Sequence, residues 1–379
     1  MKILVTVSTF YPQKDGVQAV TEYLTKGLAQ KGHEVTIVTS QVEGSPEEEN
    51  FMGMKIIRVP VYTKYALHFG NKKKYQQLIV KLAKDADVLI NVCTQTAFTD
   101  FLYPVLPQIK CKKILHMHGM YDFCWRRTDF NSFKAFAYKI WRHIRWGWLY
   151  FVNTNKFKQY NHVLQLHRFD DAYTFFKKHY GIEGIVLENA AEDKFYCQDI
   201  EDKKPYAICV SNYIPRKNQE FLLKSFYESN AGKDMELILI GSMETSYYKY
   251  LQKLNNSLQK KYGPRKVQLL TGISREKTIE YVKNASVYLM GSTWEAFSIS
   301  LIEAMAAGTV FISTDVGVAR YLPGGVICKT AKDMAYWLDV FNANAEVRES
   351  LAGAALHYYK KHLTIESKVN ILNQLLKKD

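Results

Sequence analysis

The 379-residue sequence predicts an α/β fold of two consecutive domains, each with a parallel β-sheet between layers of helices. Three observations predict it. Short apolar runs alternate along the chain with segments of helical spacing. A polar, charged stretch that ends at Pro205 separates two series of these runs. The length also favours two domains, because the core of one domain stops growing near about 250 residues.

The first strand, helix and strand set the fold class. Residues 2–8 form a continuous apolar run, which is typical of a strand buried on both faces of a parallel sheet. Residues 17–30 have helical spacing, and Lys31 and Gly32 predict the end of that helix. Residues 34–39 are the next strand. Two strands joined through a helix predict parallel pairing.

The same rhythm continues to the end of the chain. In the N-terminal half it predicts strands at residues 87–92, 113–117 and 162–166. In the C-terminal half it predicts strands at residues 206–210, 236–240, 266–270, 286–290 and 309–313. We therefore predict an N-terminal domain over 1–190, a hinge over 191–205, a C-terminal domain over 206–355, and a helix over 356–379 that packs back on the N-terminal domain.

Composition narrows the class of protein. No run of about 18 apolar residues occurs, so we expect no transmembrane helix. The six cysteines are scattered without a CxxC pair, which favours reduced thiols in a cytoplasmic protein. The net charge is +14, of which residues 1–190 carry +10. A basic N-terminal half predicts an anionic partner, which can be a membrane surface, a phosphorylated substrate or a nucleic acid.

The stretch 291–317 is the most informative for chemistry. A strand ends at Met290, a loop contains Glu295, and a helix is predicted from near Ser298 to Gly308, with Glu303 two turns inside it. Free N–H groups and the helix dipole at such an N-terminus suit a diphosphate, or the charge that grows on a leaving diphosphate. Glu295 can then hold sugar hydroxyls, and Glu303 can reach a ribose.

This stretch, EAFSISLIEAMAAG, resembles the E-x7-E signature of retaining glycosyltransferases of family 4, which have the GT-B fold of two Rossmann-like domains facing a cleft. The resemblance implies that Glu295 contacts the donor sugar and Glu303 the nucleotide ribose. It also implies donor contacts from the residues around the helix start, Phe297, Ser298, Ile299 and Ser300. The alternative is an amphipathic helix with two solvated carboxylates.

A second match follows the strand at 206–210. The family has a Gly-Arg pair there and a lysine five residues beyond the arginine, both on the diphosphate. Lys217 stands at the lysine position, whereas Ser211-Asn212 replaces Gly-Arg. Asn212 can donate a hydrogen bond to phosphate but adds no charge, and Arg216 is a candidate replacement. A solvated helix start is the alternative for all three.

Four less specific matches complete the resemblance. Gly241 and Ile273 follow strands, and Ile273 is expected to meet the base through its backbone, although ordinary turns explain both positions equally well. Gly16 stands in a loop like the family's glycine loop, and His118 resembles the family's histidine on the donor sugar. His116 shares a strand face with His118, but no third metal ligand is evident, so the alternative for His118 is a core histidine.

Residues 121–160 combine fourteen aromatic residues with a strong basic bias. Residues 110–160 contain eleven Lys or Arg against two Asp. This pattern is typical of a helix lying on an anionic bilayer, with rings at head-group depth. The alternatives are a helix whose rings complete the N-terminal core and a surface that stacks on nucleic acid. We expect the membrane contact and no nucleic acid.

The resemblance implies retaining transfer of a sugar from a nucleotide-diphosphate donor, with a UDP-sugar favoured, to a hydroxyl of a lipid-linked or glycan acceptor. We assign catalytic roles to Glu295, His118 and Lys217. We expect no cofactor and activity without a metal. The expected setting is surface polysaccharide or glycolipid synthesis at the inner face of a bacterial membrane. The alternatives are a sugar-nucleotide epimerase, a phosphorylase and a non-catalytic partner subunit.

Overall fold

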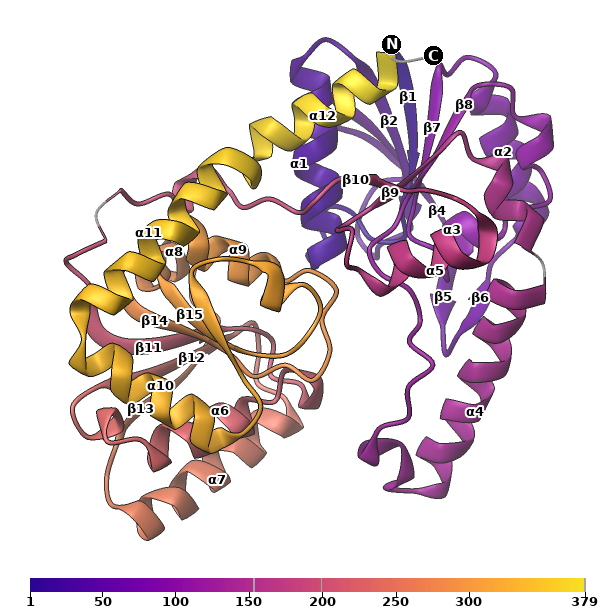
Figure 1. Ribbon diagram of the computed structural model, residues 1–379. Helices are drawn as coiled ribbons and strands as arrows, with labels where there is room; N and C mark the ends of the chain where they lie inside the picture. The colour runs from indigo at the N-terminus through magenta and orange to yellow at the C-terminus, as the bar shows by residue number, and fades with distance from the viewer. Residues whose placement is uncertain (153, 199, 378–379) are drawn as a thin grey trace. The chain divides into compact units, whose positions relative to one another are not determined.

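The computed structural model describes residues 1–152, 154–198 and 200–377 (Figure 1). The chain divides into two compact units. Unit 1 contains Met1–Glu188 and Val369–Asp379, and unit 2 contains Asn189–Lys368. Each unit has its own sheet and its own buried core. The predicted α/β fold with two Rossmann-like domains is confirmed.

Unit 1 is built on an eight-stranded sheet with the order β10-β9-β8-β7-β1-β2-β4-β3. All pairs are parallel except the edge pair β3–β4. The strands are β1 (Lys2–Thr6), β2 (Glu34–Ser40), β3 (Glu48–Phe51), β4 (Met54–Val59), β7 (Val88–Val92), β8 (Lys112–His116), β9 (His162–Gln165) and β10 (Ile185–Val186). A separate hairpin consists of β5 (Tyr62–Lys64) and β6 (Leu67–Phe69).

Helices of unit 1 flank this sheet (Figure 1). They are α1 (Gly16–Gln30), α2 (Lys72–Ala83), α3 (Ala97–Asp100), α4 (Phe133–Gly147) and α5 (Asp171–Tyr180). One of them, α4, extends away from the sheet (Figure 1). Short 3-10 helices are η1 (Leu106–Gln108), η2 (Arg127–Phe130) and η4 (Thr154–Gln159), and η3 (Trp148–Val152) is a π-helical turn. Asp15 caps α1 by accepting a hydrogen bond from the backbone N–H of Gln18 at 2.7 Å.

The last helix, α12 (Ile365–Lys377), returns to unit 1 and lies beside α1 (Figure 1). A Cβ on Gly27 of α1 would lie 2.4 Å from the side chain of Val369, so the close approach of the two helices requires glycine there. His33 Nε2 and Asn373 Oδ1 are 2.7 Å apart. The predicted start of this helix at residue 356 is wrong, because residues 345–362 form one continuous helix of unit 2.

Unit 2 has a six-stranded parallel sheet with the order β13-β12-β11-β14-β15-β16. Its strands are β11 (Lys204–Val210), β12 (Glu236–Gly241), β13 (Lys266–Thr271), β14 (Ala285–Met290), β15 (Val310–Thr314) and β16 (Gly325–Cys328). Its helices are α6 (Gln219–Glu228), α7 (Ser246–Tyr262), α8 (Arg275–Asn284), α9 (Ile299–Ala306), α10 (Ala331–Ala343) and α11 (Ala345–His362). Short 3-10 helices are η5 (Asp193–Phe195), η6 (Pro215–Lys217), η7 (Ala231–Lys233) and η8 (Ala319–Tyr321).

Each of the ten predicted strands corresponds to an observed strand whose ends differ by at most two residues. The hinge predicted at residues 191–205 is corrected, because unit 2 already begins at Asn189. The Asn189 amide donates to the carbonyl of Phe297 at 2.9 Å, and Ala191 pairs with Thr364 in a β-bridge. These contacts attach the start of the polar stretch to unit 2. Among the described residues, no helix has the length and apolar character that crossing a bilayer requires.

Candidate functional site

The site in unit 2 forms where β14 ends and α9 begins. Helix α9 is apolar on nearly all sides, and its residues Leu301, Ile302 and Met305 are at most 1% exposed. Its N-terminus at Ser298 lies beyond the carboxyl end of β14, at the edge of a parallel sheet where ligands usually bind. The side chain of the N-cap residue Ser298 makes no capping hydrogen bond. The first backbone N–H groups of α9 therefore remain available for a ligand.

Glu295 and Lys217 form a close ion pair beside this helix start. Lys217 Nζ lies 2.6 Å from Glu295 Oε1, and the two side chains are 17% and 10% exposed. The hydroxyl of Ser292 donates to the same oxygen at 2.7 Å. Two residues that are 78 positions apart, and that we predicted on separate motifs, therefore meet in one constellation.

Lys217 is carried by a turn and not by a regular helix. It is the last residue of η6, and Asn218 follows in the left-handed conformation with φ 52°. The α-helix starts only at Gln219. The carbonyl of Arg216 accepts the backbone N–H of Thr293 at 2.9 Å, which ties the Lys217 turn to the loop of Glu295. The alternative of a solvated helix start is thus corrected, because Lys217 ends a 3-10 turn before α6 and its side chain is largely buried.

The loop of Glu295 is also held from the next strand. A Cβ on Gly317, whose φ is +54°, would lie 2.3 Å from the carbonyl of Ala296 and 2.6 Å from that of Glu295. The hydroxyl of Thr314 donates to the carbonyl of Ser292 at 2.6 Å. The backbone around Glu295 is therefore clamped on both sides before any ligand binds.

Glu303 lies inside α9 and has a different partner. It is 3% exposed, and its Oε1 is 2.5 Å from Arg275 Nη2 at the first residue of α8. Burial raises the pKa of Glu303, and the guanidinium of Arg275 opposes that rise. Since α9 begins at Ile299, Glu303 is one turn inside the helix and not two, as the sequence predicted.

The remaining unit 2 candidates have distinct positions. Asn212 and Arg216 are exposed after β11, and the Arg216 guanidinium lies 5.3 Å from the centre of the Trp294 ring. Gly241 is buried, and a Cβ there would lie 2.4 Å from the Tyr213 ring, which explains glycine by packing. Ile273 is half-buried and precedes α8 by two residues.

The other candidates of the α9 region have polar or buried surroundings. Phe297 is 5% exposed. Ser298 and Ser300 lie 3.1 Å apart through their hydroxyls, and Tyr288 donates to Ser300 at 2.7 Å. Ile299, the first residue of α9, is half-buried. The predicted donor residues of unit 2 therefore gather around the carboxyl ends of β11 to β14.

In unit 1, His118 follows β8 and is half-buried. Its Nε2 is buried and has no hydrogen-bond partner among the described residues. Burial lowers the pKa of His118 to about 4, so the ring is neutral near pH 7. The His116 ring lies 4.3 Å from it, centre to centre. Among the described residues, no three His, Cys, Asp or Glu side chains are grouped as a metal site would require.

Gly16 occupies a different position from the one predicted. It is the first residue of α1, directly after the capping residue Asp15, and it is exposed. The sequence predicted it inside a loop before the helix. The correction follows from the Asp15 cap, which starts the helix one residue earlier than Val17.

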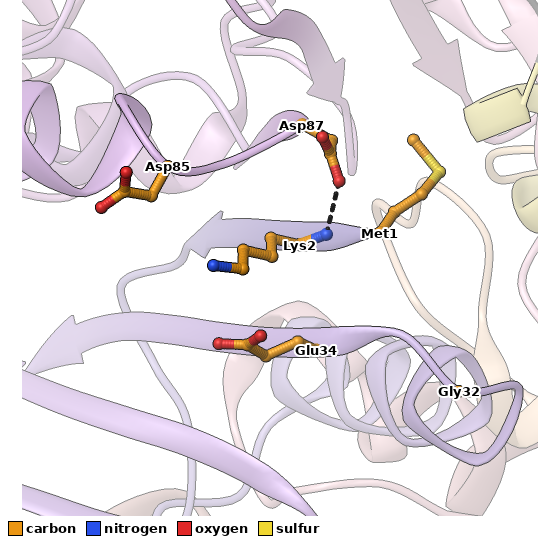
Figure 2. Close-up of a pocket in the computed structure, with 6 residues that line it drawn as sticks. All are labelled: Met1, Lys2, Gly32, Glu34, Asp85 and Asp87. Carbon is orange, nitrogen blue, oxygen red and sulfur yellow. Dashed lines mark hydrogen bonds between the residues drawn. The ribbon is translucent and has the colours of Figure 1, made fainter.

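A surface pocket lies elsewhere in unit 1, at the amino ends of the strands (Figure 2). Lys2 and Glu34 line it from β1 and β2, together with Asp85 and Asp87. The backbone N–H of Lys2 donates to Asp87 at 2.7 Å, so one carboxylate already has a partner. Because His118 follows the carboxyl end of β8, this pocket is separate from the predicted site.

The aromatic segment 121–160 divides between core and surface. Six of its apolar residues are buried in the unit 1 core, namely Tyr121, Trp146, Leu149, Tyr150, Phe157 and Tyr160. Other apolar residues on α4 and at its end are well exposed, with Phe133 at 85%, Ile144 at 63% and Trp148 at 55%. The segment therefore supplies part of the core and leaves a second set of apolar side chains exposed.

With two doubly wound units and a polar site at the end of the second sheet, the architecture is that of the GT-B glycosyltransferases. Two family models match the chain: "Glycosyltransferase Family 4" over residues 14–167 and "Glycosyl transferases group 1" over residues 192–324. The chain belongs to the family 4 type of glycosyltransferases.

Curated relatives share part of the sequence. A GDP-Man:Man(3)GlcNAc(2)-PP-Dol alpha-1,2-mannosyltransferase from Eremothecium gossypii is 24% identical over 166 residues, which is 42% of this chain and 27% of the relative. The mouse protein of the same name is 26% identical over 117 residues, 29% of this chain and 24% of the relative. The matched segments span about a quarter of the length of these relatives.

Solved structures share the fold over nearly the whole chain. Sucrose-phosphate synthase from Thermosynechococcus elongatus has a TM-score of 0.75 at 15% identity, covering 99% of this chain and 98% of that one. WaaG, a glycosyltransferase involved in lipopolysaccharide biosynthesis, has a TM-score of 0.69 at 16% identity over 100% of both chains. Anabaena HepE in complex with UDP and glucose has a TM-score of 0.69 at 12% identity over 99% of both.

Sequence reasoning missed three residues that hold the predicted ones. Arg275 binds Glu303, Glu192 binds Arg275, and Ser292 binds Glu295. Arg275 and Glu192 lie far along the chain from Glu303, and only the fold brings them together. Ser292 had a local signal, since it follows the strand end by two residues and precedes Glu295 by three.

Proposed function

We propose that the protein transfers a sugar from a nucleoside diphosphate sugar to an acceptor hydroxyl, with retention at the anomeric carbon. One observation carries the proposal: Lys217, Glu295 and the N-terminus of α9 meet at the carboxyl edge of the unit 2 sheet. A cation beside free N–H groups suits a diphosphate, and a carboxylate beside it suits sugar hydroxyls.

The charges of this site match the charge that develops in the reaction. As the bond between sugar and phosphate breaks, negative charge grows on the leaving diphosphate. Lys217 and the N–H groups at Ser298 and Ile299 stabilise that charge without reorganising. In other enzymes a divalent metal stabilises this negative charge. Because these groups can stabilise it here, we expect activity without a metal.

In the resting site, Glu295 neutralises Lys217. A bound diphosphate brings more negative charge than one carboxylate and takes over the ammonium. Glu295 then accepts hydrogen bonds from the sugar, and Glu303 accepts them from the ribose. For His118 we keep the predicted sugar contact, which fits a neutral ring whose Nε2 can accept a hydrogen bond from a hydroxyl. The acceptor hydroxyl attacks from the face that the diphosphate leaves, which retains the configuration.

Two donor bases are supported by different relatives. The family resemblance favours a UDP-sugar, and HepE was solved with UDP and glucose. The curated relatives are named for GDP-mannose and for a dolichol-linked glycan acceptor. We propose a lipid-linked or glycan acceptor for this chain, and surface polysaccharide or glycolipid synthesis at the inner face of a bacterial membrane as its setting.

An exposed apolar surface on unit 1 supports such an acceptor. The exposed apolar residues of α4 recur at helical spacing, and we call them the outer stripe: Phe133, Ile140, Trp141 and Ile144. On another face of the helix, Lys139 is buried near Asp122 and Asp129. The helix thus leaves the outer stripe exposed and turns Lys139 and Trp146 inward, so only part of its apolar surface completes the core.

The hairpin β5–β6 extends this surface. Trp141 Nε1 donates to the carbonyl of Tyr65 at 3.1 Å, and Tyr65 is 65% exposed. Leu67 is also exposed, and Lys64 beside it adds a positive charge. Aromatic and basic side chains side by side suit the interface of an anionic bilayer.

A thermal-shift screen tests the donor proposal. Wild type and Glu303→Ala are heated with UDP-sugars, GDP-sugars, the free nucleoside diphosphates and ATP. A ligand that binds only the folded state raises its stability, by about 2.7 kcal/mol at a hundredfold excess over Kd. We expect one nucleotide sugar to raise the wild-type Tm and to lose that effect in the variant. No shift with any nucleotide sugar would contradict the proposal and favour a non-catalytic partner subunit.

A further inference from the structure

Arg275 has an unusual set of contacts at the nucleotide end of the predicted site. Its Nη2 lies 2.5 Å from Glu303 Oε1, while Nε and Nη2 lie 3.1 and 2.7 Å from Glu192 Oε1. Its guanidinium carbon is 4.7 Å from the centre of the Phe195 ring. One guanidinium therefore bridges two carboxylates and packs on a ring, which fixes its plane.

The bridge joins three elements of unit 2. Arg275 is the first residue of α8, Glu303 belongs to α9, and Glu192 precedes η5. Arg275 also follows Ile273, the residue predicted to meet the base, by two positions. The arginine therefore begins the helix that follows the β13 loop, and its partner is the carboxylate predicted to meet the ribose.

We propose that Arg275 is a positioning residue that holds the Glu303 carboxylate ready to accept hydrogen bonds from the ribose hydroxyls of the donor. The inference rests on the proposed function and assigns it a residue that the family motif does not contain. Arg275 occupies Oε1, which leaves Oε2 and further lone pairs of Glu303 for the ribose. Glu192 and Phe195 keep Arg275 in place.

The proposal predicts a pH dependence with a definite sign. The titratable groups that face Glu303 are Arg275, Glu192 and the phenol of Tyr288. Burial raises the pKa of Glu303, the Arg275 charge lowers it, and Glu192 raises it again. Without Arg275 the pKa of Glu303 rises further, so a larger fraction of Glu303 is protonated at any given pH. A protonated Glu303 accepts fewer hydrogen bonds, and nucleotide affinity then improves as pH increases.

The test measures the Kd of UDP and of GDP by calorimetry at pH 6.5 and pH 8. The variants are Arg275→Met, Arg275→Lys, Glu303→Gln and the double variant Arg275→Met/Glu303→Gln. Lys277→Met is the matched control, because this exposed lysine of α8 pairs only with Glu280 among the described acidic residues. Thermal melts without ligand show that each variant is folded.

For the better of the two nucleotides, we expect Arg275→Met to weaken binding at least tenfold at pH 6.5 and to regain part of it at pH 8. Arg275→Lys is expected to lie between it and wild type. We expect Glu303→Gln to bind weakly at both pH values and the double variant to match it within about twofold, since a neutral Gln needs no counter-charge. Lys277→Met is expected to bind like wild type.

Two results would overturn the inference while leaving the proposed function intact. One is wild-type affinity in Arg275→Met and Arg275→Lys while Glu303→Gln binds weakly. The other is an equal loss at both pH values that adds to the loss of Glu303→Gln, because a purely structural role predicts that pattern. Wild type that binds neither nucleotide, or a Glu303→Gln variant that binds like wild type, contradicts the proposed function and the inference together.

Discussion

The ion pair between Lys217 and Glu295 sets the electrostatics of the empty site. Both side chains are largely buried, and the Ser292 hydroxyl also binds Glu295. A buried charge without a partner is costly, so each residue stabilises the other until a ligand arrives. We therefore expect the proposed donor to bind by an exchange of partners, in which its diphosphate replaces Glu295 on Lys217.

Replacing Lys217 with Met removes the cation that the diphosphate needs. A hydrogen bond to a charged group contributes about 1.5–3 kcal/mol, so we expect nucleoside diphosphates to bind about ten- to a hundredfold more weakly. Calorimetry measures the change. The control is Lys224→Met, which removes a more exposed lysine paired with Glu220 and leaves binding unchanged. Full affinity in Lys217→Met would contradict the assignment of Lys217 to the diphosphate.

His118 makes a prediction about acid stability. Burial holds its pKa near 4, below the value of about 6.5 expected in an unfolded chain. As pH falls from 6.5 to 4, the unfolded chain takes up a proton that the folded chain does not, so stability decreases. This shift corresponds to about 3 kcal/mol of lost stability at pH 4, to which the buried His116 adds its own contribution.

We expect His118→Gln, which removes the titrating group and keeps a polar side chain, to lose less stability than wild type between pH 7 and pH 4.5. Thermal melts at several pH values measure the difference. An equal acid dependence in the two proteins would show that His118 is not held neutral in the folded state.

Sequence alone predicted the residues with a local signal and missed those that depend on the fold. Glu295 and Glu303 stand near a strand end and a predicted helix start, so their positions could be inferred. Arg275 precedes Glu303 by 28 residues and Glu192 precedes Arg275 by 83. Their meeting depends on how α8 and α9 pack, which no local pattern encodes.

Among the helices, α4 best illustrates what periodicity leaves undecided. A helix is predicted here, but its apolar residues occur on several of its faces. Periodicity alone therefore allows two orientations of the helix toward the core. The ion pairs of Lys139 with Asp122 and Asp129 decide it, because they require the face that carries Lys139 to point inward. The outer stripe is then left exposed.

Replacing Ile144 and Trp148 with Ser removes two large apolar side chains next to each other on this surface. We expect binding to liposomes that contain anionic lipid to fall at least fivefold, because each side chain contributes about 1.5–3 kcal/mol when it leaves water. A flotation assay measures the bound fraction. The control is Tyr336→Ser, an exposed ring on α10 of unit 2. Wild type that does not float with either neutral or anionic liposomes would contradict the membrane proposal.

The chain folds into two units, and unit 1 consists of two segments that are far apart in the sequence. The predicted C-terminal domain starts at residue 206, whereas unit 2 starts at Asn189, because the polar stretch read as a hinge belongs to unit 2. The return of Val369–Asp379 to unit 1 was expected, but its start was not. Helix α11 ends at His362 and helix α12 begins at Ile365, so only two residues separate them. This short connection contains no proline or glycine that would mark a helix end in the sequence.

The central claim is that unit 2 binds a nucleotide sugar for transfer, and sugar transfer itself tests it most directly. The donor that the thermal-shift screen identifies, carrying a radiolabelled sugar, is incubated with lipid-linked acceptors and with wild type or Glu295→Gln. We expect label in the acceptor with wild type, with the donor's anomeric configuration retained. In Glu295→Gln we expect donor binding and at least a hundredfold slower transfer. Transfer at the wild-type rate in Glu295→Gln, or no transfer with any UDP- or GDP-sugar, would contradict it.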